Sequence, residues 1–558
     1  MKMTLQLNSP GMTSLHKAGL AGLYMTLRAL KRQHARRQRQ QVKQDVSRPV
    51  IGGLKWMLSA KQVELEWEDA KLKEAFTELI NKSFSIDAEG FIRLAGLEPD
   101  KEPTPAHKHH LYLALINSFL QFGPIRPTEN KRTLTYEVDD RKCWIKEFAP
   151  IKKFPHQFVA QDFIEEDKEK KAHFKTAIEA ASWLYPGGGQ RHVAHKNTKL
   201  NESTEQALAL LFAPIGVIYF TLRSRSKGRK ARLALLIPEI QDLDSYAEMR
   251  EDFAARGVLE LTASGASDAA LRLLAMTESK RAGNQFAQET NTPFICRVVT
   301  FGIVNWNEKQ KSRTSSYTVV SGEIRGLENY NRAMAIFPNR WQRSAEETNR
   351  KGEVTKPESY FITTYSAREF IADNIAHGNV WYHDLAGYMN TKEAREALTT
   401  YEKKEMAQMV KEAVFDTDKD TGGERLFVQV CHESWRRRMG KLGERARKEG
   451  LGISGFQRLV NKDGERLRTS LMRSKNADTL RETVVDFWAR SGSNEHLQGD
   501  GLAKLLPFFD EKNWRRARDL TLLALISYQP QSPQEAAALI ADVTEDAGDI
   551  NTQVGGED

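Results

Sequence analysis

The chain has 558 residues, a length that predicts about two to four domains and more than one buried core. Hydrophobic residues make up 40% and charged residues 28% of the chain, which excludes the fibrous, membrane-embedded and wholly disordered classes. The three cysteines, Cys143, Cys296 and Cys431, lie far apart, so a disulfide framework and a paired-cysteine metal knuckle are excluded. A reducing cytoplasm is the expected location.

The charge is unevenly distributed along the chain. The net charge is +9, yet no Lys or Arg follows Arg518, whereas eight Asp and Glu residues do. A basic body with an acidic tail favours a polyanionic partner such as nucleic acid. A soluble enzyme with a basic surface is the alternative that composition leaves open.

The N-terminal segment contains an apolar stretch at residues 18–27. Leu20, Leu23 and Leu27 fall on one helical face, and a basic run follows in place of a cleavage site, so we expect a docked amphipathic helix and no signal peptide. Between residues 28 and 48 the chain has eight Lys and Arg and one acid, Asp45. This asymmetry indicates either contact with a nucleic-acid backbone or an ordinary solvated helix face.

The next part of the chain alternates helical and strand patterns. Helical periodicity covers 67–84 and 109–122, and short strands are expected at 133–139 and 142–148. The uncharged run 206–222 is interrupted by Pro and Gly, which predicts a helix followed by a buried strand and no membrane span. The pattern is that of an α+β fold.

Two β-hairpins with basic tips are predicted in the middle of the chain. The first joins 215–222 to 232–240, and the second joins 294–306 to 316–324. The candidate DNA-contacting residues of the two tips are Arg223, Arg225, Lys227, Arg229, Lys230, Lys309, Lys311 and Arg313. Phosphate contact is one interpretation of these charges, and protection of strand edges from aggregation is the other.

A third candidate contact is the loop that begins with three glycines, 187–189. Arg191, His195 and Lys196 follow, and a glycine backbone allows close approach to a phosphate. A plain flexible connection explains the same residues.

Strand patterns end near residue 390. Asn390 and Glu393 predict a capping box that opens a helix through residue 415. Further helices are expected at 431–449, 454–473, 477–490, 501–506 and 511–528. Their aromatic residues, Trp435, Phe456, Phe487, Trp488 and Trp514, have helical spacing and are interpreted as core.

The expected fold is therefore α+β, with a mixed α/β N-terminal body that carries basic hairpins, followed by an all-α bundle. We expect four parts: a docking helix and basic segment (1–50), a mixed α/β nucleic-acid-binding body (51–389), a basic helical bundle (390–530) and an acidic tail (531–558), in which Ser532 and Glu535 predict one more capping box.

The search for chemistry in the sequence is negative. No Gly-rich phosphate loop or nucleophile elbow is present. The carboxylates Asp416, Asp418, Asp420 and Glu424 resemble a calcium loop, but Thr421 stands where that loop requires Gly. His107, His109, His110, His192 and His195 lack ligand partners and are expected at the surface or in caps. We expect no catalytic residue, metal or cofactor; a metal-dependent nuclease and a free-standing packaging protein are the alternatives.

The segment 5–27 resembles the N-terminal signature of the large subunits of type I CRISPR surveillance complexes (Cascade), and in particular the MYXAN-type subfamily of subtype I-B. The matching positions are Leu5, Leu7, Pro10, Gly11, Leu15, His16, Ala18, Gly19, Leu20, Gly22 and Leu23. The resemblance implies a non-catalytic subunit that lies at the 5′ handle of the crRNA, recognises the protospacer-adjacent motif in double-stranded DNA and helps to open the duplex.

The resemblance also implies partners. These are crRNA, target DNA, the backbone and handle-binding subunits, and an effector that is a helicase-nuclease or a transposition adaptor. We expect Asn8, His16, Lys17, Arg28 and Arg32 to dock on crRNA and neighbouring subunits. No membrane partner is expected.

In several such systems the C-terminal helices are also made alone, from an internal start, as a small subunit. Here Glu402 to Glu405 are encoded only by purines whichever codons are used, so a ribosome-binding tract can precede Met406 or Met409. An ordinary charged helix turn is the alternative.

Overall fold

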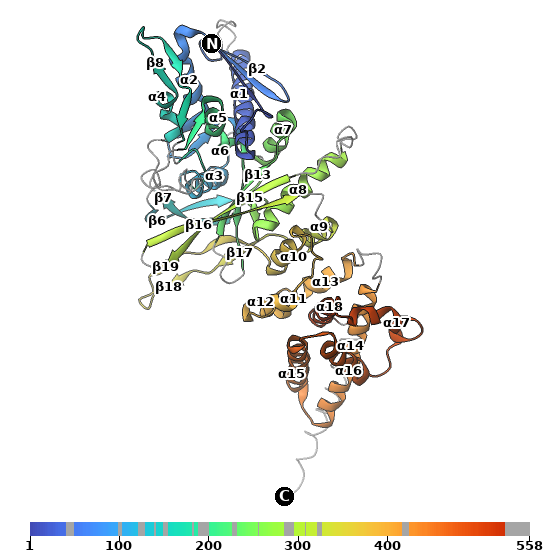
Figure 1. Cartoon of the computed structure of the whole chain (residues 1–558). Helices are drawn as coiled ribbons and strands as arrows, with labels where there is room; N and C mark the ends of the chain where they lie inside the picture. The colour runs from blue at the N-terminus through green and yellow to red at the C-terminus, as the bar shows by residue number, and fades with distance from the viewer. Residues whose placement is uncertain are drawn as a thin grey trace. The chain divides into compact units, whose positions relative to one another are not determined.

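The fold was analysed in a computed structural model of the chain (Figure 1). The structure describes residues 1–40, 50–98, 103–120, 129–138, 141–148, 154–180, 183–187, 200–225, 231–254, 256–283, 295–306, 309–320, 326–415 and 423–529. The chain forms two units: unit 1 consists of Met1–Glu323 and Asn339–Thr364, and unit 2 of Ile324–Pro338 and Tyr365–Asp558. Among the described helices, none combines the length and the apolar character that a membrane span requires.

Helix α1 (Ser14–Gln40) is the central element of unit 1 and lies against α5 (Thr204–Leu211) and α6 (Ala213–Gly216) (Figure 1). The helix predicted from the leucine spacing is confirmed, but it is not amphipathic along its first half, because every residue from 18 to 27 is buried. The uncharged run 206–222 forms α5, α6 and the buried strand β12 (Ile218–Leu222), as predicted.

Glycines explain how α1 is buried on all sides. A Cβ atom at Gly22 would lie 2.2 Å from Phe212 O, and one at Gly216 would lie 1.6 Å from Ala18 O. Only residues without a side chain let the two backbones approach so closely. The glycines of the N-terminal signature therefore have a packing role.

Unit 1 contains three larger sheets. The first has the order β1-β3-β2, the second β14-β12-β13-β15-β16 and the third β17-β20-β7-β6. Their strands are β1 (Lys2–Gln6), β2 (Leu54–Leu58), β3 (Gln62–Trp67), β6 (Glu129–Val138), β7 (Arg141–Phe148), β12, β13 (Ala231–Pro238), β14 (Thr262–Ala263), β15 (Ile295–Trp306), β16 (Lys309–Val320), β17 (Arg340–Ser344) and β20 (Ser359–Thr363).

Short hairpins and helices complete unit 1. The hairpins are β4 (Phe84–Ile86) with β5 (Ile92–Leu94), β8 (Ile164–Glu166) with β9 (Ala172–Phe174), β10 (Ala177–Glu179) with β11 (Asn201–Ser203), and β18 (Glu347–Thr348) with β19 (Val354–Lys356). The other helices are α2 (Leu72–Ser83), α3 (Pro105–Asn117), α4 (Ala160–Phe163), α7 (Leu243–Ala254) and α8 (Ala266–Gly283).

Unit 2 is helical throughout its described part. Its helices are α9 (Leu327–Ile336), α10 (Ser366–Ala376), α11 (Leu385–Tyr388), α12 (Lys392–Glu396), α13 (Lys403–Glu412), α14 (Glu424–Lys448), α15 (Gly452–Arg473), α16 (Ala477–Ser491), α17 (Gly501–Leu505) and α18 (Trp514–Ser527). The five bundle aromatics predicted as core are buried. A mixed α/β body followed by a helical bundle is therefore confirmed, whereas the four expected domain boundaries stay predictions.

The helix predicted from residue 391 to 415 is wrong as a continuous element. Thr391, not Asn390, caps α12, a π-turn follows at 397–401, and α13 begins at Lys403. The break occurs at Glu402, whose carboxylate turns inward and accepts hydrogen bonds from Ser366 N at 2.9 Å and Ala367 N at 2.7 Å. Capping α10 in this way stabilises orphan amide groups at the cost of helix continuity.

The predicted position at the surface or in a cap is wrong for His109 of the histidine cluster. All three residues lie in α3, and His109 is only 5% exposed. Burial lowers the pKa of His109 and of His110 to about 4. Hydrophobic periodicity does not reveal this burial, because it counts His as polar, whereas a neutral His can pack in apolar surroundings.

Candidate nucleic-acid interface

The two predicted hairpins belong to one sheet and turn at the same end of it. Strand β13 begins at Ala231, which pairs with Gly302 of β15, and Gly302 in turn pairs with Arg313 of β16 (Figure 1). The second hairpin continues past this level to Trp306 and Lys309. The described ends of both hairpins therefore lie at one end of the sheet, which we call the basic sheet end (223–225, 302–306 and 309–313).

Only part of the first tip lies within the described residues. Arg223 and Arg225 are exposed, and the backbone of Arg223 is held by a hydrogen bond from its N to Ala263 O at 2.9 Å. Thr364 donates its hydroxyl proton to Arg223 O, which ties the base of the tip to the segment after β20. The predicted contacts Lys227, Arg229 and Lys230 lie outside the described residues.

The second basic segment is a strand, not the loop expected from the sequence. Lys309, Lys311 and Arg313 are at alternate positions of β16 and pair with Trp306, Val304 and Gly302. The alternation of charged and uncharged residues in 309–315 is a period-two signal that predicts a strand.

Of the predicted glycine loop, only Gly187 lies within the described residues. Gly187, with a φ of 81°, donates its backbone N–H to Ser118 O at 2.9 Å. Arg191, His195 and Lys196 lie outside the described residues, so their contact with DNA stays a prediction.

The residues predicted to dock on crRNA lie mostly inside unit 1. His16 is 3% exposed, with Nδ1 2.7 Å from Thr13 Oγ1 and Nε2 3.4 Å from a carboxylate oxygen of Glu202. Lys17 pairs with Glu239. Of the five residues, Asn8 alone is exposed to the degree of a surface residue.

The two arginines of α1 also have partners in unit 1. Arg28 lies 2.9 Å from Asp244 and Arg32 lies 3.1 Å from Glu251, and both acids belong to α7. These contacts hold α1 against α7. Docking on an RNA stays a prediction for these residues.

Sequence reasoning missed a third basic turn in unit 1. Arg350 and Lys351 are exposed between β18 and β19, in a turn where Asn349 Oδ1 accepts hydrogen bonds from Lys351 N at 2.8 Å and Glu353 N at 3.0 Å. Gly352 completes the turn with a φ of 80°. The signal was available, because Asn and Gly at this spacing are typical of such turns.

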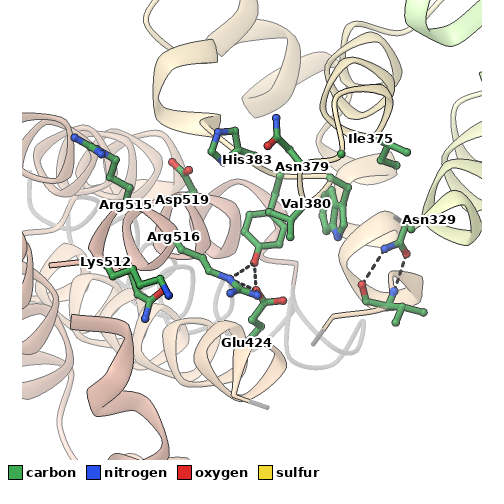
Figure 2. Close-up of a pocket in the computed structure, with 16 residues that line it drawn as sticks. Asn329, Ile375, Asn379, Val380, His383, Glu424, Lys512, Arg515, Arg516 and Asp519 are labelled. Carbon is green, nitrogen blue, oxygen red and sulfur yellow. Dashed lines mark hydrogen bonds and ion pairs between the residues drawn. The ribbon is translucent and has the colours of Figure 1, made fainter. Parts of the chain in front are cut away.

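Unit 2 contains a polar pocket of about 390 Å³ (Figure 2). Lys512 and Arg515 lie on one side, and Asn379 and His383, from the segment between α10 and α11, lie on another. Trp381 also lines the pocket, and its buried indole N–H has no hydrogen-bond partner among the described residues. The lining offers more donors than acceptors, which suits a polar or anionic group.

The floor of this pocket is a buried ion pair. Glu424, with a side chain 2% exposed, accepts hydrogen bonds from Tyr382 and Arg516 (Figure 2). Its charge is therefore compensated inside the fold, which argues against Glu424 as the end of a calcium loop. Asp416, Asp418 and Asp420 lie outside the described residues, and within the described ones no group of three His, Cys, Asp or Glu residues is placed to hold a metal ion.

Comparison with known proteins identifies the class of the chain. The model of the DevT N-terminal domain matches residues 4–211, and the model of the DevT C-terminal domain matches residues 415–552. Together the two models match more than half of the chain.

The chain belongs to the DevT family. It is similar to the CRISPR-associated protein Cas8a1/Csx13 of Myxococcus xanthus (strain DK1622), with 29% identity over 565 residues that cover 98% of this chain and 91% of that protein. The resemblance read from the N-terminal signature is confirmed.

Proposed function

We propose that this chain is the large subunit of a crRNA-guided DNA surveillance complex, in which it recognises the protospacer-adjacent motif in duplex DNA, aids R-loop formation and recruits an effector. Family membership over both ends of the chain supports this proposal. The observation that carries it is the basic sheet end, where strand pairing brings Arg223 and Arg225 to the same end of one sheet as the basic positions of β16.

In this proposal the basic sheet end grips the phosphate backbone of the duplex. Phosphate contacts set the position of a protein on DNA, and a few base contacts then read a short motif. The exposed Arg223 and Arg225 and the alternating cations of β16 supply the phosphate contacts. The turn with Arg350 and Lys351, and the loop with Arg191, His195 and Lys196, are further candidate contacts in the same unit.

The proposed partners are crRNA, the target duplex, the backbone and handle-binding subunits of the complex, and a helicase-nuclease or transposition adaptor as effector. Asn8, His16, Lys17, Arg28 and Arg32 remain the proposed docking residues for crRNA and neighbouring subunits. Since the last four also pair within unit 1, the exposed turn around Asn8 is the first candidate for direct contact. The complex works in the cytoplasm, and bond cleavage belongs to the effector.

A variant that neutralises the first tip tests the proposal. We expect R225Q/K227Q/R229Q/K230Q to weaken duplex binding by the crRNA-loaded complex and to lower the slope of log K against log salt by about 0.9 for each phosphate that the tip no longer neutralises. The matched control K71Q/K73Q/K82Q/K171Q removes the same charge from exposed lysines that pair with glutamates elsewhere in unit 1. Equal salt slopes for the two variants would contradict the proposal.

Two further measurements separate the proposal from its alternatives. Purification of the tagged chain should recover a uniform short RNA and partner subunits. The purified chain should leave DNA and RNA intact with Mg²⁺ or Mn²⁺. Cleavage that disappears on replacement of a single acidic residue would instead indicate a metal-dependent nuclease.

A small subunit made from an internal start is part of the proposal. The C-terminal family model begins at residue 415, a few residues after Met406 and Met409. Replacement of both methionines should abolish a short C-terminal product in cells. A short product of unchanged amount would remove this element of the proposal.

A further inference from the structure

Unit 1 contains a cavity of about 510 Å³ that is separate from the basic sheet end. It lies between the N-terminal turns of α3, the last turn of α7 and strand β12. One part of the lining is apolar, with Leu97, Leu111, Ile218, Phe253 and Leu261. The polar part has the donors Thr104, His107, Lys108, His110, Tyr219 and Arg250 and the acids Glu98, Glu251 and Asp252, of which Glu98 pairs with Arg93 and Glu251 with Arg28 and Arg32. The size is that of a small-molecule site, and the mixture of apolar and polar walls is typical of one.

A buried arginine lines this cavity, and among the described residues it has no carboxylate partner. Arg250 is 5% exposed, and its Nε donates a hydrogen bond to Val217 O at 3.0 Å. Burial lowers its pKa, and the groups that oppose this shift are the phenols of Tyr246 and Tyr219, not a carboxylate. The neighbouring acid Glu251 pairs with Arg28 and Arg32 of α1 instead.

An uncompensated buried cation is unfavourable, so its presence calls for an explanation. The hydrogen bond from Arg250 ties α7 to the segment just before β12. This role does not require a charge, because the neutral hydroxyl of Tyr246 donates a hydrogen bond to Gly216 O in the same segment. A bound anion would compensate Arg250, since a guanidinium can donate two parallel hydrogen bonds to an oxyanion.

Two histidines add further unused polar atoms to the same cavity. The Nε2 atoms of His107 and His110 are buried and make no hydrogen bond of normal geometry among the described residues, although the backbone of Arg256 lies near the first ring and that of Tyr219 near the second. Burial lowers the pKa of His110 to about 4, and the nearby charges of His107 and Arg250 act in the same direction. An anion in the cavity would favour the protonated form of these rings and offer acceptors to their N–H groups.

The N-terminus of α3 also favours an anion in the cavity. Thr104 caps the helix by accepting a hydrogen bond from His107 N at 3.3 Å, and Thr104, His107 and Lys108 all line the cavity. The N-terminus of a helix carries partial positive charge that attracts anions. Lys108 Nζ lies 3.2 Å from a carboxylate oxygen of Asp87, which partly neutralises the positive charge that Lys108 brings to the cavity.

We propose that this cavity is a binding site for a nucleotide-sized phosphate ester, with the phosphate on Arg250 and the organic part against Phe253, Leu261 and Leu111. The donors on its walls exceed what the two oxygens of a carboxylate can use, whereas a phosphate has three terminal oxygens. The ligand is either a free nucleotide or the phosphorylated end of a nucleic-acid strand. The proposal is independent of duplex binding at the basic sheet end.

The test uses the full-length chain and four probes: inorganic phosphate, dAMP, a 5′-phosphorylated octanucleotide and the same octanucleotide with a 5′-hydroxyl. Calorimetry should show binding of dAMP or of the phosphorylated strand, and not of the 5′-hydroxyl strand, to this site. Arg250→Met keeps the aliphatic stem and should weaken that binding by about tenfold or more, the value of one charge-assisted contact. The control Arg256→Met removes an arginine that pairs with Glu260 outside the cavity and should leave binding unchanged.

Each outcome decides the proposal. Binding of dAMP that Arg250→Met abolishes identifies a free-nucleotide site, and binding of the phosphorylated strand alone identifies a strand-end site. Absence of binding by every probe, or equal affinities of wild type and Arg250→Met, would overturn the proposal. If Arg250→Met does not fold, His107→Ala at the half-buried rim should weaken the same binding by at least about threefold, and an unchanged affinity would overturn the proposal as firmly.

Discussion

Asp519 is a buried acid whose charge depends on pH within the working range of the protein. It is 3% exposed in α18, and its Oδ1 accepts a hydrogen bond from Ala386 N at 3.1 Å. Burial raises its pKa to about 7, whereas an aspartate in the unfolded chain titrates near 3.9. Because the folded-state pKa is the higher one, the contribution of Asp519 to stability is most favourable below pH 4 and is lost as the pH rises through about 7.

Asp519→Asn should therefore stabilise unit 2 at alkaline pH. The amide oxygen can still accept the bond from Ala386 N, and the cost of a buried charge, about 4 kcal/mol at pH 8, is removed. We expect a higher free energy of unfolding than wild type at pH 8 and an equal one at pH 4, measured by denaturant unfolding at both pH values. Asp478→Asn, at a side chain 75% exposed, is the control. A gain of equal size at both pH values would contradict the prediction.

At the scale of residues, side-chain type predicted burial well only for apolar groups. The bundle aromatics were correctly assigned to the core, because large apolar side chains repeated on one face of a helix are usually buried. His109, Glu402 and Asp519 were not, since the sequence does not show which backbone amides or cavities a polar side chain will meet. The candidate cation Arg250 was missed for the same reason.

The crossing of α1 with α5 and α6 depends on glycine. Gly22→Ala should destabilise unit 1 by about 3 kcal/mol, because the new Cβ would lie 2.2 Å from Phe212 O, a backbone atom that cannot move alone. Gly440→Ala in α14 is the matched control, since a Cβ there meets nothing within 4 Å. Its expected effect is opposite in sign, a gain of about 1 kcal/mol from helix propensity.

Hydrogen exchange measured on peptides of α1 and of α14 separates these two effects. Protection of α1 should fall in Gly22→Ala, and protection of α14 should rise in Gly440→Ala. Equal protection of α1 in wild type and Gly22→Ala would contradict the close helix crossing.

At the scale of elements, periodicity predicted the existence of most helices and hairpins but not their interruptions. The first hairpin and the helices of the bundle follow local patterns, and each was confirmed. The helix through 391–415 failed because Glu402 caps α10, a tertiary contact without a local signal. The second hairpin was confirmed, but its second strand begins at Lys309 and not near 316, because the positive charges of 309–313 were interpreted as loop despite their period-two signal.

At the scale of the whole molecule, the sequence patterns did not predict which distant strands pair with each other. Strand β13 pairs with β15, about 60 residues further along the chain, and this pairing creates the basic sheet end. Charge alone predicted which residues are candidates, but no local pattern predicts that they share one end of one sheet. The two family models, 4–211 and 415–552, leave this region between them.

The organisation of unit 2 bears on a product that starts at Met406. Val414 and Asn329 exchange two hydrogen bonds, of 2.7 and 2.9 Å, which tie the end of α13 to α9. Met406 and Met409 are fully buried within α13. A chain that begins at Met406 lacks α9 to α12, so it leaves the backbone groups of Val414 without these partners and removes the helix α9 against which α13 packs, while the packing of α13 on α18 remains.

The absence of α9 to α12 predicts that the fragment 406–558 is much less stable than the fragment 324–558. Loss of two hydrogen bonds and of the packing of α13 against α9 costs on the order of several kcal/mol, which is comparable with the whole stability of a small domain. Thermal unfolding of 324–558 should be cooperative, whereas 406–558 should melt at a lower temperature or over a broad range and become cooperative only when bound in the assembled complex. If the two fragments melted at the same temperature, α9 and α10 would be dispensable for the bundle, and a free small subunit would need no assembly to persist.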